Sequence, residues 1–343
     1  MKTLKTNTNV AEEWLGIDAT SVVEDVATSL REQLSETLRR RGLVVAMSGG
    51  VDSSVAAGVA VEAVGPGRVF GLFMPERDSD PRSLELARAW AEELGIEYAI
   101  EDIAPTLEAV GCYERRDEAI RSVVPEYGPD WKSKIVLPGN RLDSDRLNTF
   151  SVVVESPDGE RASHRLPPAE YRTIVAATNF KQRVRKMFEY YHADRLHYAV
   201  LGTPNRLEYD QGFFVKGGDG LADTKPLAHL YKTQVYALAE ELDVPEAVTE
   251  RPPTTDTYSL AQTQEEFYFA LPTESMDLVL YAHNEGLDAG EAAGELGLET
   301  EQVERAYRDI EQKRSTTRYL HVPPLLAGDV PEIRPRGEHG DAG

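Results

Sequence analysis

One short turn of this sequence carries residue types suited to holding a phosphate group. Residues 48–54 read SGGVDSS and lie between a buried-strand pattern at 43–47 and an apolar, alanine-rich helix pattern at 55–64. The glycines allow a tight turn whose backbone N–H groups point toward an anion at the positive end of the following helix. The donors that this turn could offer to a phosphate are Ser48, Gly49, Gly50, Ser53 and Ser54.

Asp52 is the one acidic residue of this turn. A carboxylate in that position is suited to holding Mg²⁺ against phosphate oxygens. The chain contains no GxxxxGK[ST] motif, so the turn is not a Walker-type loop. The alternative is a glycine-rich turn without a function. The strand–turn–helix context is what a phosphate site requires, however, and it therefore predicts a magnesium-assisted phosphate site.

The elements around the turn alternate between strands and helices. Further strand patterns lie at 68–73, 96–100 and 197–203, and helix patterns at 21–41, 81–94, 105–124, 169–192 and 231–242. This alternation predicts an α/β fold with a doubly wound parallel sheet and flanking helices. The rhythm breaks at 125–168, where two alternating segments flank the turn signal PDG. We expect that insertion to contain a β-hairpin.

The chain reads as one decorated domain. We expect residues 1–20 to form an N-terminal arm, residues 21–327 a single domain, and residues 328–343 a flexible tail rich in proline, glycine and charge. No apolar run approaches the roughly 20 residues that a membrane-spanning helix needs. The first residues lack the apolar core of a signal peptide.

Composition favours a cytoplasmic protein. The single cysteine, Cys112, excludes an intramolecular disulfide or a cysteine zinc site, and its apolar surroundings predict a buried, unreactive thiol. The 59 acidic residues outnumber the 37 basic ones, which gives a formal charge of −22. So negative a surface argues against nucleic acid as a partner. An anionic substrate must then be held by a local cluster of cations or N–H groups.

Two segments carry a resemblance to a known family. The turn at 48–54 resembles the pyrophosphatase loop of the N-type ATP pyrophosphatases, which adenylate an oxygen of their substrate and release pyrophosphate. Residues 200–242 are similar to ammonia-dependent NAD synthetases in the patterns GT..N..E, GFF.K.GDG..D and P..L.KTQV, and a PP[ST] motif follows at 252–254. The resemblance implies an adenine nucleotide alpha hydrolase-like fold, with ATP as a co-substrate and Mg²⁺ as the cofactor.

The resemblance also implies roles for individual residues. It places Thr203, Lys232 and Thr254 against ATP, and it makes Asp52, Lys232 and Thr254 the catalytic residues. Glu208 joins Asp52 as a magnesium ligand, whereas outside this block it would read as a solvated helix carboxylate. The residues that it turns toward the dinucleotide substrate are Lys216, Asp219 and Asp223.

A third segment, NFKQRVRKMFEYY at 179–191, is similar to a family helix that helps bind deamido-NAD at a dimer interface. The resemblance implies a homodimer and a basic substrate-binding set of Asn179, Lys181, Arg183 and Arg185. Met187 falls one residue later than the methionine of the family pattern. From the residues alone, the alternative is a solvated basic face with internal ion pairs, which is less favoured than anion binding.

The expected reaction converts deamido-NAD, ATP and ammonia into NAD, AMP and pyrophosphate. Ammonia would arrive free or from a separate glutaminase, since the chain has no room for a fused one. The insertion at 125–168 and the loop at 254–277 depart from the simple family pattern. The aromatic run Phe267–Phe269 in that loop could border an acyl pocket or pack on the sheet.

Two other functions remain open on these residues. The departures could indicate a related amide ligase for a different carboxylic acid. A non-catalytic nucleotide-binding protein is less favoured, because Asp52, Glu208 and Lys232 are all present.

Overall fold

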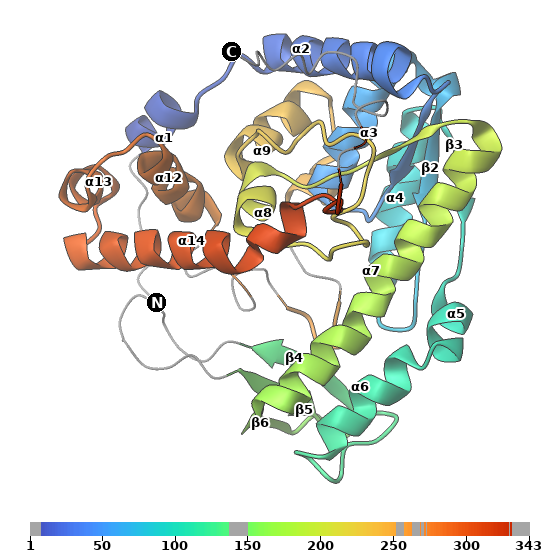
Figure 1. Cartoon of the computed structure of the whole chain (residues 1–343), viewed down its shortest axis with the longest axis vertical. Coiled ribbons are helices and arrows are strands. Elements are labelled where there is room, and N and C mark those ends of the chain that lie inside the picture. Colours follow the sequence, from blue (N-terminus) through green and yellow to red (C-terminus); the bar gives the residue numbers. More distant parts are fainter. Residues whose placement is uncertain are drawn as a thin grey trace.

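A parallel four-stranded sheet lies at the centre of the chain (Figure 1). The computed structural model describes residues 8–136, 150–251, 257–262, 268, 271, 273–328 and 330. The sheet order is β3-β2-β1-β7, and its strands are β1 (Leu43–Ala46), β2 (Val69–Phe73), β3 (Glu97–Ile100) and β7 (Ala199–Leu201). All three pairings are parallel, as the alternation of strands and helices predicts.

Helices cover both faces of this sheet, because alternate side chains of each strand point to opposite sides. Leu43 and Val45 pack into one core, whereas Val44 packs into another. The first core is shared with α2 (Ala19–Glu32), α3 (Val51–Val64), α4 (Pro81–Glu93) and α9 (Lys232–Glu241). The second is shared with α5 (Ala104–Ala109), α6 (Cys112–Arg121) and the long helix α7 (Pro168–Leu196). The predicted α/β class is confirmed.

A second, antiparallel sheet belongs to the insertion and lies at the far end of α7 from the parallel sheet (Figure 1). The predicted hairpin is present as β5 (Ser151–Glu155) and β6 (Arg161–Arg165). A third strand, β4 (Lys132–Val136), pairs with β5 and was not predicted. Its sequence KSKIV carries too few apolar residues to show a strand pattern, and Ser133 is buried where such a pattern would place an apolar residue.

Helix boundaries differ from the predictions in three places. The helix expected at 105–124 is divided into α5 and α6, because Gly111 adopts a left-handed conformation with φ of 69°. In place of one helix over 21–41, α2 ends at Glu32 and the chain continues as a π-helical turn at Gln33–Leu38. A short helix, α1 (Thr8–Leu15), lies within the predicted N-terminal arm.

The C-terminal part of the chain is helical. It comprises α12 (Thr273–Asn284), α13 (Ala289–Leu296) and α14 (Thr300–His321), which form a layer with α1 beside the parallel sheet (Figure 1). The last helix, α14, ends at His321. The expected tail lies largely outside the described residues, and the division of the chain into arm, domain and tail stays a prediction.

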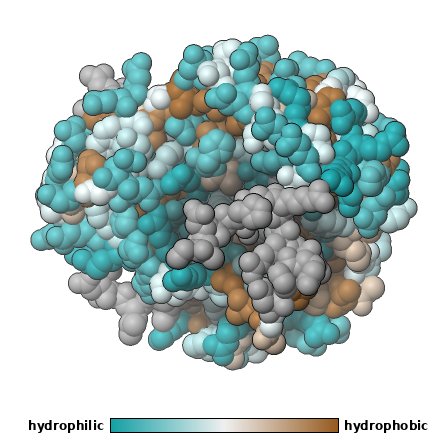
Figure 2. Space-filling view, turned by 45° about the horizontal axis from the view of Figure 1, so that its top comes forward, coloured by the Kyte–Doolittle hydropathy of each residue, from teal (hydrophilic) through white to brown (hydrophobic). Residues whose placement is uncertain are grey.

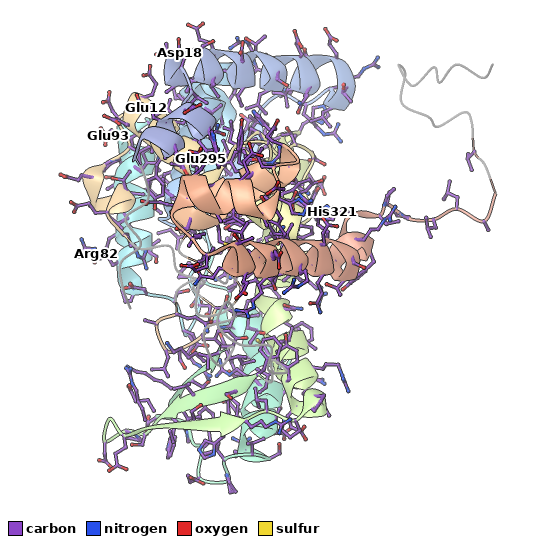
Figure 3. The ribbon with its side chains drawn as sticks, turned by 90° about the vertical axis from the view of Figure 1, so that its left-hand side faces the viewer. Glu12, Asp18, Arg82, Glu93, Glu295 and His321 are labelled. Carbon is purple, nitrogen blue, oxygen red and sulfur yellow. The ribbon has the colours of Figure 1, made fainter. Side chains whose placement is uncertain are left out.

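Charged side chains dominate the surface. The labelled residues Asp18, Arg82 and Glu93 lie at the margin of the molecule (Figure 3), and hydrophilic residues cover most of the described face in Figure 2. No helix of the described ranges is long and apolar enough to cross a membrane. Cys112 is fully buried, as predicted, and burial raises the pKa of its thiol to about 11.

Trp90 on α4 joins two of the helices on the first face. Its side chain is 2% exposed, and its indole Nε1 donates a hydrogen bond of 2.9 Å to the carbonyl oxygen of Ser54 on α3. Because α3 begins at the predicted phosphate turn, this contact helps to fix the orientation of α3 and therefore the position of the turn.

We expect Trp90→Phe to lower the free energy of unfolding by about 1–3 kcal/mol, because it removes this hydrogen bond and part of a buried contact. Urea unfolding followed by circular dichroism measures the change. Trp131→Phe is the matched control, since Trp131 is only partly buried and packs edge-on against Tyr127 in the insertion. Equal losses in the two variants would show that the Trp90 contact has no special weight.

Candidate active site

A cavity of about 1090 Å³ opens at the carboxyl ends of the parallel strands. Its lining includes Met47 after β1, Met74 after β2 and Thr203 after β7. Strand β1 is the first strand in the chain but lies inside the sheet, with β2 on one side of it and β7 on the other. The cavity therefore lies at a topological switch point, where open α/β sheets bind their ligands.

The predicted phosphate turn forms one wall of the cavity, at the N-terminus of α3. Gly49 has φ of 75°, and a Cβ atom there would lie 2.3 Å from the carbonyl oxygen of Ser83, so only glycine fits. Ser53 Oγ accepts from the Ser48 N–H at 3.1 Å and donates to the Gly50 carbonyl at 3.0 Å. These bonds hold the turn in a fixed shape before any ligand binds.

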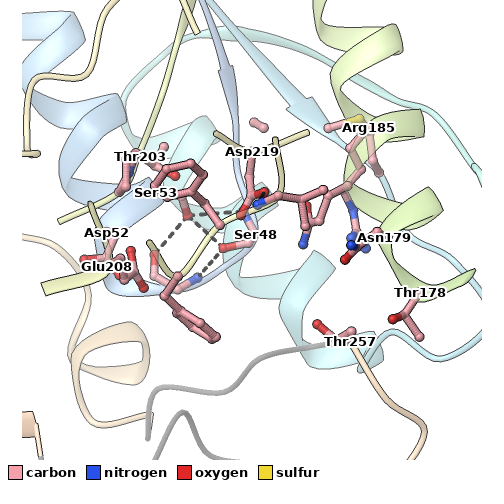
Figure 4. Close-up of a pocket in the computed structure, with 18 of the residues that line it drawn as sticks. Ser48, Asp52, Ser53, Thr178, Asn179, Arg185, Thr203, Glu208, Asp219 and Thr257 are labelled. Atoms are coloured by element: carbon pink, nitrogen blue, oxygen red, sulfur yellow. Dashed lines mark hydrogen bonds between the residues drawn. The ribbon is translucent and has the colours of Figure 1, made fainter. Parts of the chain in front are cut away.

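The members of the turn do not all reach the cavity. Its lining includes Ser48, Gly50, Asp52 and Ser53. Ser54 is 1% exposed and is buried in the core beneath α3. Gly49 packs against the backbone of Ser83. The dashed hydrogen bonds of Figure 4 show how Ser48 and Ser53 meet at the centre of the turn.

Asp52 and Lys232 form a buried ion pair across the cavity wall. Lys232 is the first residue of α9 and is 2% exposed, and its Nζ donates to Asp52 Oδ2. Burial by itself would lower the pKa of Lys232, but the negative charges of Asp52 and Glu208 outweigh it and the pKa is raised. The ammonium therefore keeps its charge in the site.

Asn205 connects this pair to Glu208. Its Nδ2 donates to Asp52 Oδ1 at 3.2 Å, and its Oδ1 accepts from the Glu208 N–H at 3.1 Å. The second of these bonds caps α8 (Arg206–Gln211), and Glu208 closes the capping box by accepting from the Asn205 N–H at 3.3 Å. Asn205 was not predicted as a site residue, although the spacing N-x-x-E just before a helix signals such a cap.

Asp52 and Glu208 would suit a magnesium ion whose other ligands are oxygens of a bound phosphate and water. Asp52 and Glu208 both line the cavity, and Figure 4 shows them close together below Thr203. Proteins usually hold Mg²⁺ through one or two carboxylates together with substrate phosphates. Oxygen donors of this number, next to a turn that presents N–H groups, match that arrangement.

Helix α7 supplies the opposite wall, and one stripe of its surface faces the cavity. The stripe follows the spacing of three and four residues that places side chains on one helix face. Its cavity-lining members are Tyr171, Val175, Thr178, Gln182, Arg185 and Glu189. Asn179 also lines the cavity beside this stripe, so two of the four predicted basic-segment residues, Asn179 and Arg185, lie where a substrate could touch them.

Lys181 and Arg183 lie off this stripe. The Lys181 ammonium is buried among Glu76, Asp78 and the carbonyl oxygen of Thr257, at 2.8, 2.8 and 2.7 Å. Arg183 is exposed, and its Nε donates to the Lys216 carbonyl at 3.3 Å. Their predicted contacts with substrate stay predictions.

The three residues expected to face the dinucleotide are also held by the protein. Lys216 Nζ donates to the carbonyl oxygens of Tyr319 and Val322, at 2.6 and 3.0 Å. Asp223 Oδ2 accepts from the Val200 N–H at 2.7 Å. Asp219 lines the cavity, while its Oδ1 accepts from the Val215 N–H at 2.7 Å and its burial raises its pKa.

Part of the predicted site falls outside the described residues. Thr254, Phe267 and Phe269 are in that group. Tyr268 is described: it lines the cavity, and its hydroxyl donates to the Gln211 carbonyl at 2.6 Å.

Several cavity residues were not predicted. Phe150 comes from the insertion and stacks on Tyr171 with ring centroids 3.9 Å apart. Lys186 and Glu189 form a buried ion pair of 2.6 Å on α7. Gln312, Lys313 and Thr316 on α14 also line the cavity. No local motif marks these positions, because each depends on which helix face the fold turns inward.

Comparison with known proteins gives a consistent family. The sequence model of the NAD synthase family matches residues 22–124 and 156–319. An NH(3)-dependent NAD(+) synthetase from Rhizobium meliloti (strain 1021) is 59% identical over 319 residues, which cover 93% of this chain and 95% of the relative.

Solved structures share the fold. An NMN synthetase from Francisella tularensis superposes with a TM-score of 0.60 at 22% identity, over 90% of this chain and 98% of that one. An NH3-dependent NAD synthetase from Campylobacter jejuni gives 0.59 at 20% identity, over 91% and 100% of the two chains. Taken with the cavity at the switch point and the sequence match across most of its length, these likenesses show that this chain belongs to the NAD synthase family.

Proposed function

We propose that this protein makes NAD from deamido-NAD, ATP and ammonia, with AMP and pyrophosphate as the other products. The observation that carries the proposal is the linked set of Asp52, Lys232, Asn205 and Glu208 beside a preformed phosphate turn. The NH(3)-dependent NAD(+) synthetase from Rhizobium meliloti, at 59% identity over nearly all of both chains, supports it.

The reaction takes place in two displacements. A carboxylate oxygen of the acid attacks the α-phosphorus of ATP and forms an acyl-adenylate, and pyrophosphate leaves. Ammonia then attacks the acyl carbon, the C–N bond forms, and AMP leaves with the bridging oxygen. No covalent bond to the protein is needed, so the residues act by positioning and by stabilising charge.

The residues of the cavity divide this work. The N–H groups of the turn and the Ser48 and Ser53 hydroxyls are suited to holding the phosphates, and Lys232 adds a fixed positive charge. Asp52 and Glu208 would hold Mg²⁺, which when bound offsets the charge that gathers on the departing pyrophosphate. Thr203 lines the same wall, in agreement with a role at the nucleotide.

Ammonia arrives free or from a separate glutaminase in this proposal. We place the protein's action in the cytoplasm, because the sequence has a single cysteine, Cys112, and so no intramolecular disulfide that would need an oxidising compartment. The second candidate is a different carboxylic acid, such as nicotinate mononucleotide: Phe150 from the insertion adds an aromatic ring to the cavity wall, which would suit a nicotinate group in either acid.

The deciding assay supplies ATP, Mg²⁺ and ammonium with deamido-NAD or, in parallel, nicotinate mononucleotide. We expect NAD, AMP and pyrophosphate in equal amounts from the first mixture, and slower turnover of the second acid. Release of ADP and orthophosphate would contradict the proposed chemistry, and faster use of the mononucleotide would reassign the substrate.

Asp52→Asn and Glu208→Gln are each expected to lower kcat by roughly 100-fold or more, because each removes a carboxylate that would hold the Mg²⁺ offsetting the charge on the departing pyrophosphate. If the two residues hold one ion, the double variant loses little more than either single variant. Steady-state kinetics over a range of Mg²⁺ concentrations measure both effects. Glu93→Gln on the surface of α4 is the control, and fully multiplying losses would mean that the two residues do not share a metal.

We propose that the active form is a homodimer built on the outer face of α7. Met187 and Tyr191, one helical turn apart, are 55% and 59% exposed, an unusual apolar pair in so charged a surface. Association through α7 would bring a second copy close to the wall that carries Asn179 and Arg185.

We expect a dimer in sedimentation velocity at micromolar concentration, and a monomer after Met187→Asp with Tyr191→Asp, because buried carboxylates oppose an apolar contact. Ile100→Asp, on the edge strand β3, removes another exposed apolar residue and is expected to leave the dimer intact. A wild-type monomer with full activity would refute this interface.

A further inference from the structure

Residues 257–262 lie along the open edge of β4 in the insertion sheet. Ser133 N–H donates to Ser259 Oγ at 2.8 Å, and Leu260 N–H donates to the Ser133 carbonyl at 3.2 Å. Further along, Lys134 Nζ donates to the Ala261 carbonyl at 3.1 Å and Gln262 Nε2 donates to the Ile135 carbonyl. Residues 259–262 are therefore attached to the edge of the sheet.

The first two residues of this segment form part of the cavity wall. Thr257 and Tyr258 line the cavity, together with Phe150 and Tyr171. Tyr258 is 6% exposed and packs in the core of the insertion with Ile135, among others. The insertion core and the cavity thus share the aromatic rings of Phe150, Tyr171 and Tyr258.

Lys181 holds the start of the segment from the other side. Its Nζ donates to the Thr257 carbonyl at 2.7 Å while it pairs with Glu76 and Asp78. Arg116 completes this buried charge cluster through Asp78, at 2.6 Å. The Lys181 side chain is 1% exposed, so its three acceptors replace the water that it lost.

The charges of this cluster are well matched. Burial by itself would raise the pKa of Asp78, but the nearby Lys181 and Arg116 charges outweigh it and lower the pKa to about 2. Glu76 also accepts from the Tyr113 hydroxyl at 2.8 Å. The Lys181 ammonium is thus held in place by two carboxylates, and it can orient the Thr257 carbonyl to which it donates.

The segment stands at the end of the cavity away from the phosphate turn. In Figure 4, Thr257 lies near Thr178 and Asn179, whereas Asp52 and Glu208 lie on the opposite side. The phosphate groups of ATP belong to the Asp52 side on the proposed function. The end lined by Thr257, Tyr258 and Phe150 is then left for the carboxylic acid.

We propose that Lys181 is a positioning residue rather than a substrate contact, and that it and the β4 edge together fix residues 257–262 as the acid-binding wall of the cavity. The insertion sheet thereby acquires a function: it is the support on which this wall is built. The inference rests on the proposed function only for the identity of the acid.

The test compares Ser259→Ala with Ser163→Ala. Ser259→Ala removes the acceptor of the Ser133 N–H, whereas Ser163 is an exposed residue on β6, at the opposite edge of the same sheet. Hydrogen–deuterium exchange followed by mass spectrometry reads the attachment without any need for activity. We expect amides of peptide 257–262 to exchange about tenfold faster in Ser259→Ala, since loosening of the contact favours local opening. Ser163→Ala should leave them unchanged.

Kinetics on the same variants read the consequence for the site. In Ser259→Ala we expect the KM for deamido-NAD to rise about fivefold, the KM for ATP to change by less than about twofold, and the melting temperature to stay close to that of the unaltered protein. Lys181→Met should show the same KM pattern with a lower melting temperature, because it removes the buried ammonium that pairs with both Glu76 and Asp78 and leaves only Arg116 to pair with Asp78.

The two readouts separate the possible failures. Unchanged exchange in Ser259→Ala would overturn the attachment, and faster exchange with an unchanged KM for the acid would overturn its role in acid binding. A larger rise in the KM for ATP than for the acid would assign the wall to the nucleotide instead. If the unaltered protein makes no NAD, the proposed function fails, while the exchange experiment still decides whether the wall is fixed in this way.

Discussion

The ion pair between Lys232 and Asp52 is the interaction on which the rest of the site depends. A buried ammonium is tolerated only where an anion and further donors or acceptors replace its water. Here the anion comes from the first turn of α3 and the cation from the first residue of α9, so the pair holds two helix N-termini together at the end of β1. Asn205 extends the same constraint to α8 and Glu208.

The sheet makes this convergence possible. Strands β1 and β7 are neighbours in space although more than a hundred residues separate them in the chain, and the turns that follow them open into one cavity. The phosphate turn supplies N–H donors in fixed positions. The ion pair supplies the Lys232 ammonium, which Asp52 holds in place. A site of this kind stabilises a charged transition state without reorganising, which is the main source of catalysis in reactions that need no covalent enzyme intermediate.

The insertion adds a second, smaller core to this arrangement. The sequence model of the family leaves residues 125–155 unmatched, and they include β4 and the whole of β5. That core is not isolated, because Tyr258 and Phe150 join it to the cavity and residues 259–262 bond to its edge strand β4. The phosphate-turn end of the cavity thus rests on the parallel sheet, and the end lined by Phe150, Thr257 and Tyr258 rests on the insertion.

The sequence by itself determined the features that depend on near neighbours in the chain. The SGGVDSS turn, the alternating strands and helices and the PDG hairpin are each specified within a few residues, so they were predictable. Glu208 and Lys232 were found through a block of motifs that matched a known family. Strand β4 was not predicted, because its sequence is mostly polar and its partner β5 follows only after a long connection.

Only the tertiary structure decided which charges face the cavity. Asn179, Lys181, Arg183 and Arg185 are similar in sequence context, yet a helix turns successive residues by about 100° and cannot show all of them to one ligand. The fold directs the stripe that contains Arg185 inward and gives Lys181 to a buried cluster. The role of a long side chain depends on which groups the packing places next to it. For Lys181 those groups are Glu76 and Asp78, which lie far away in the chain.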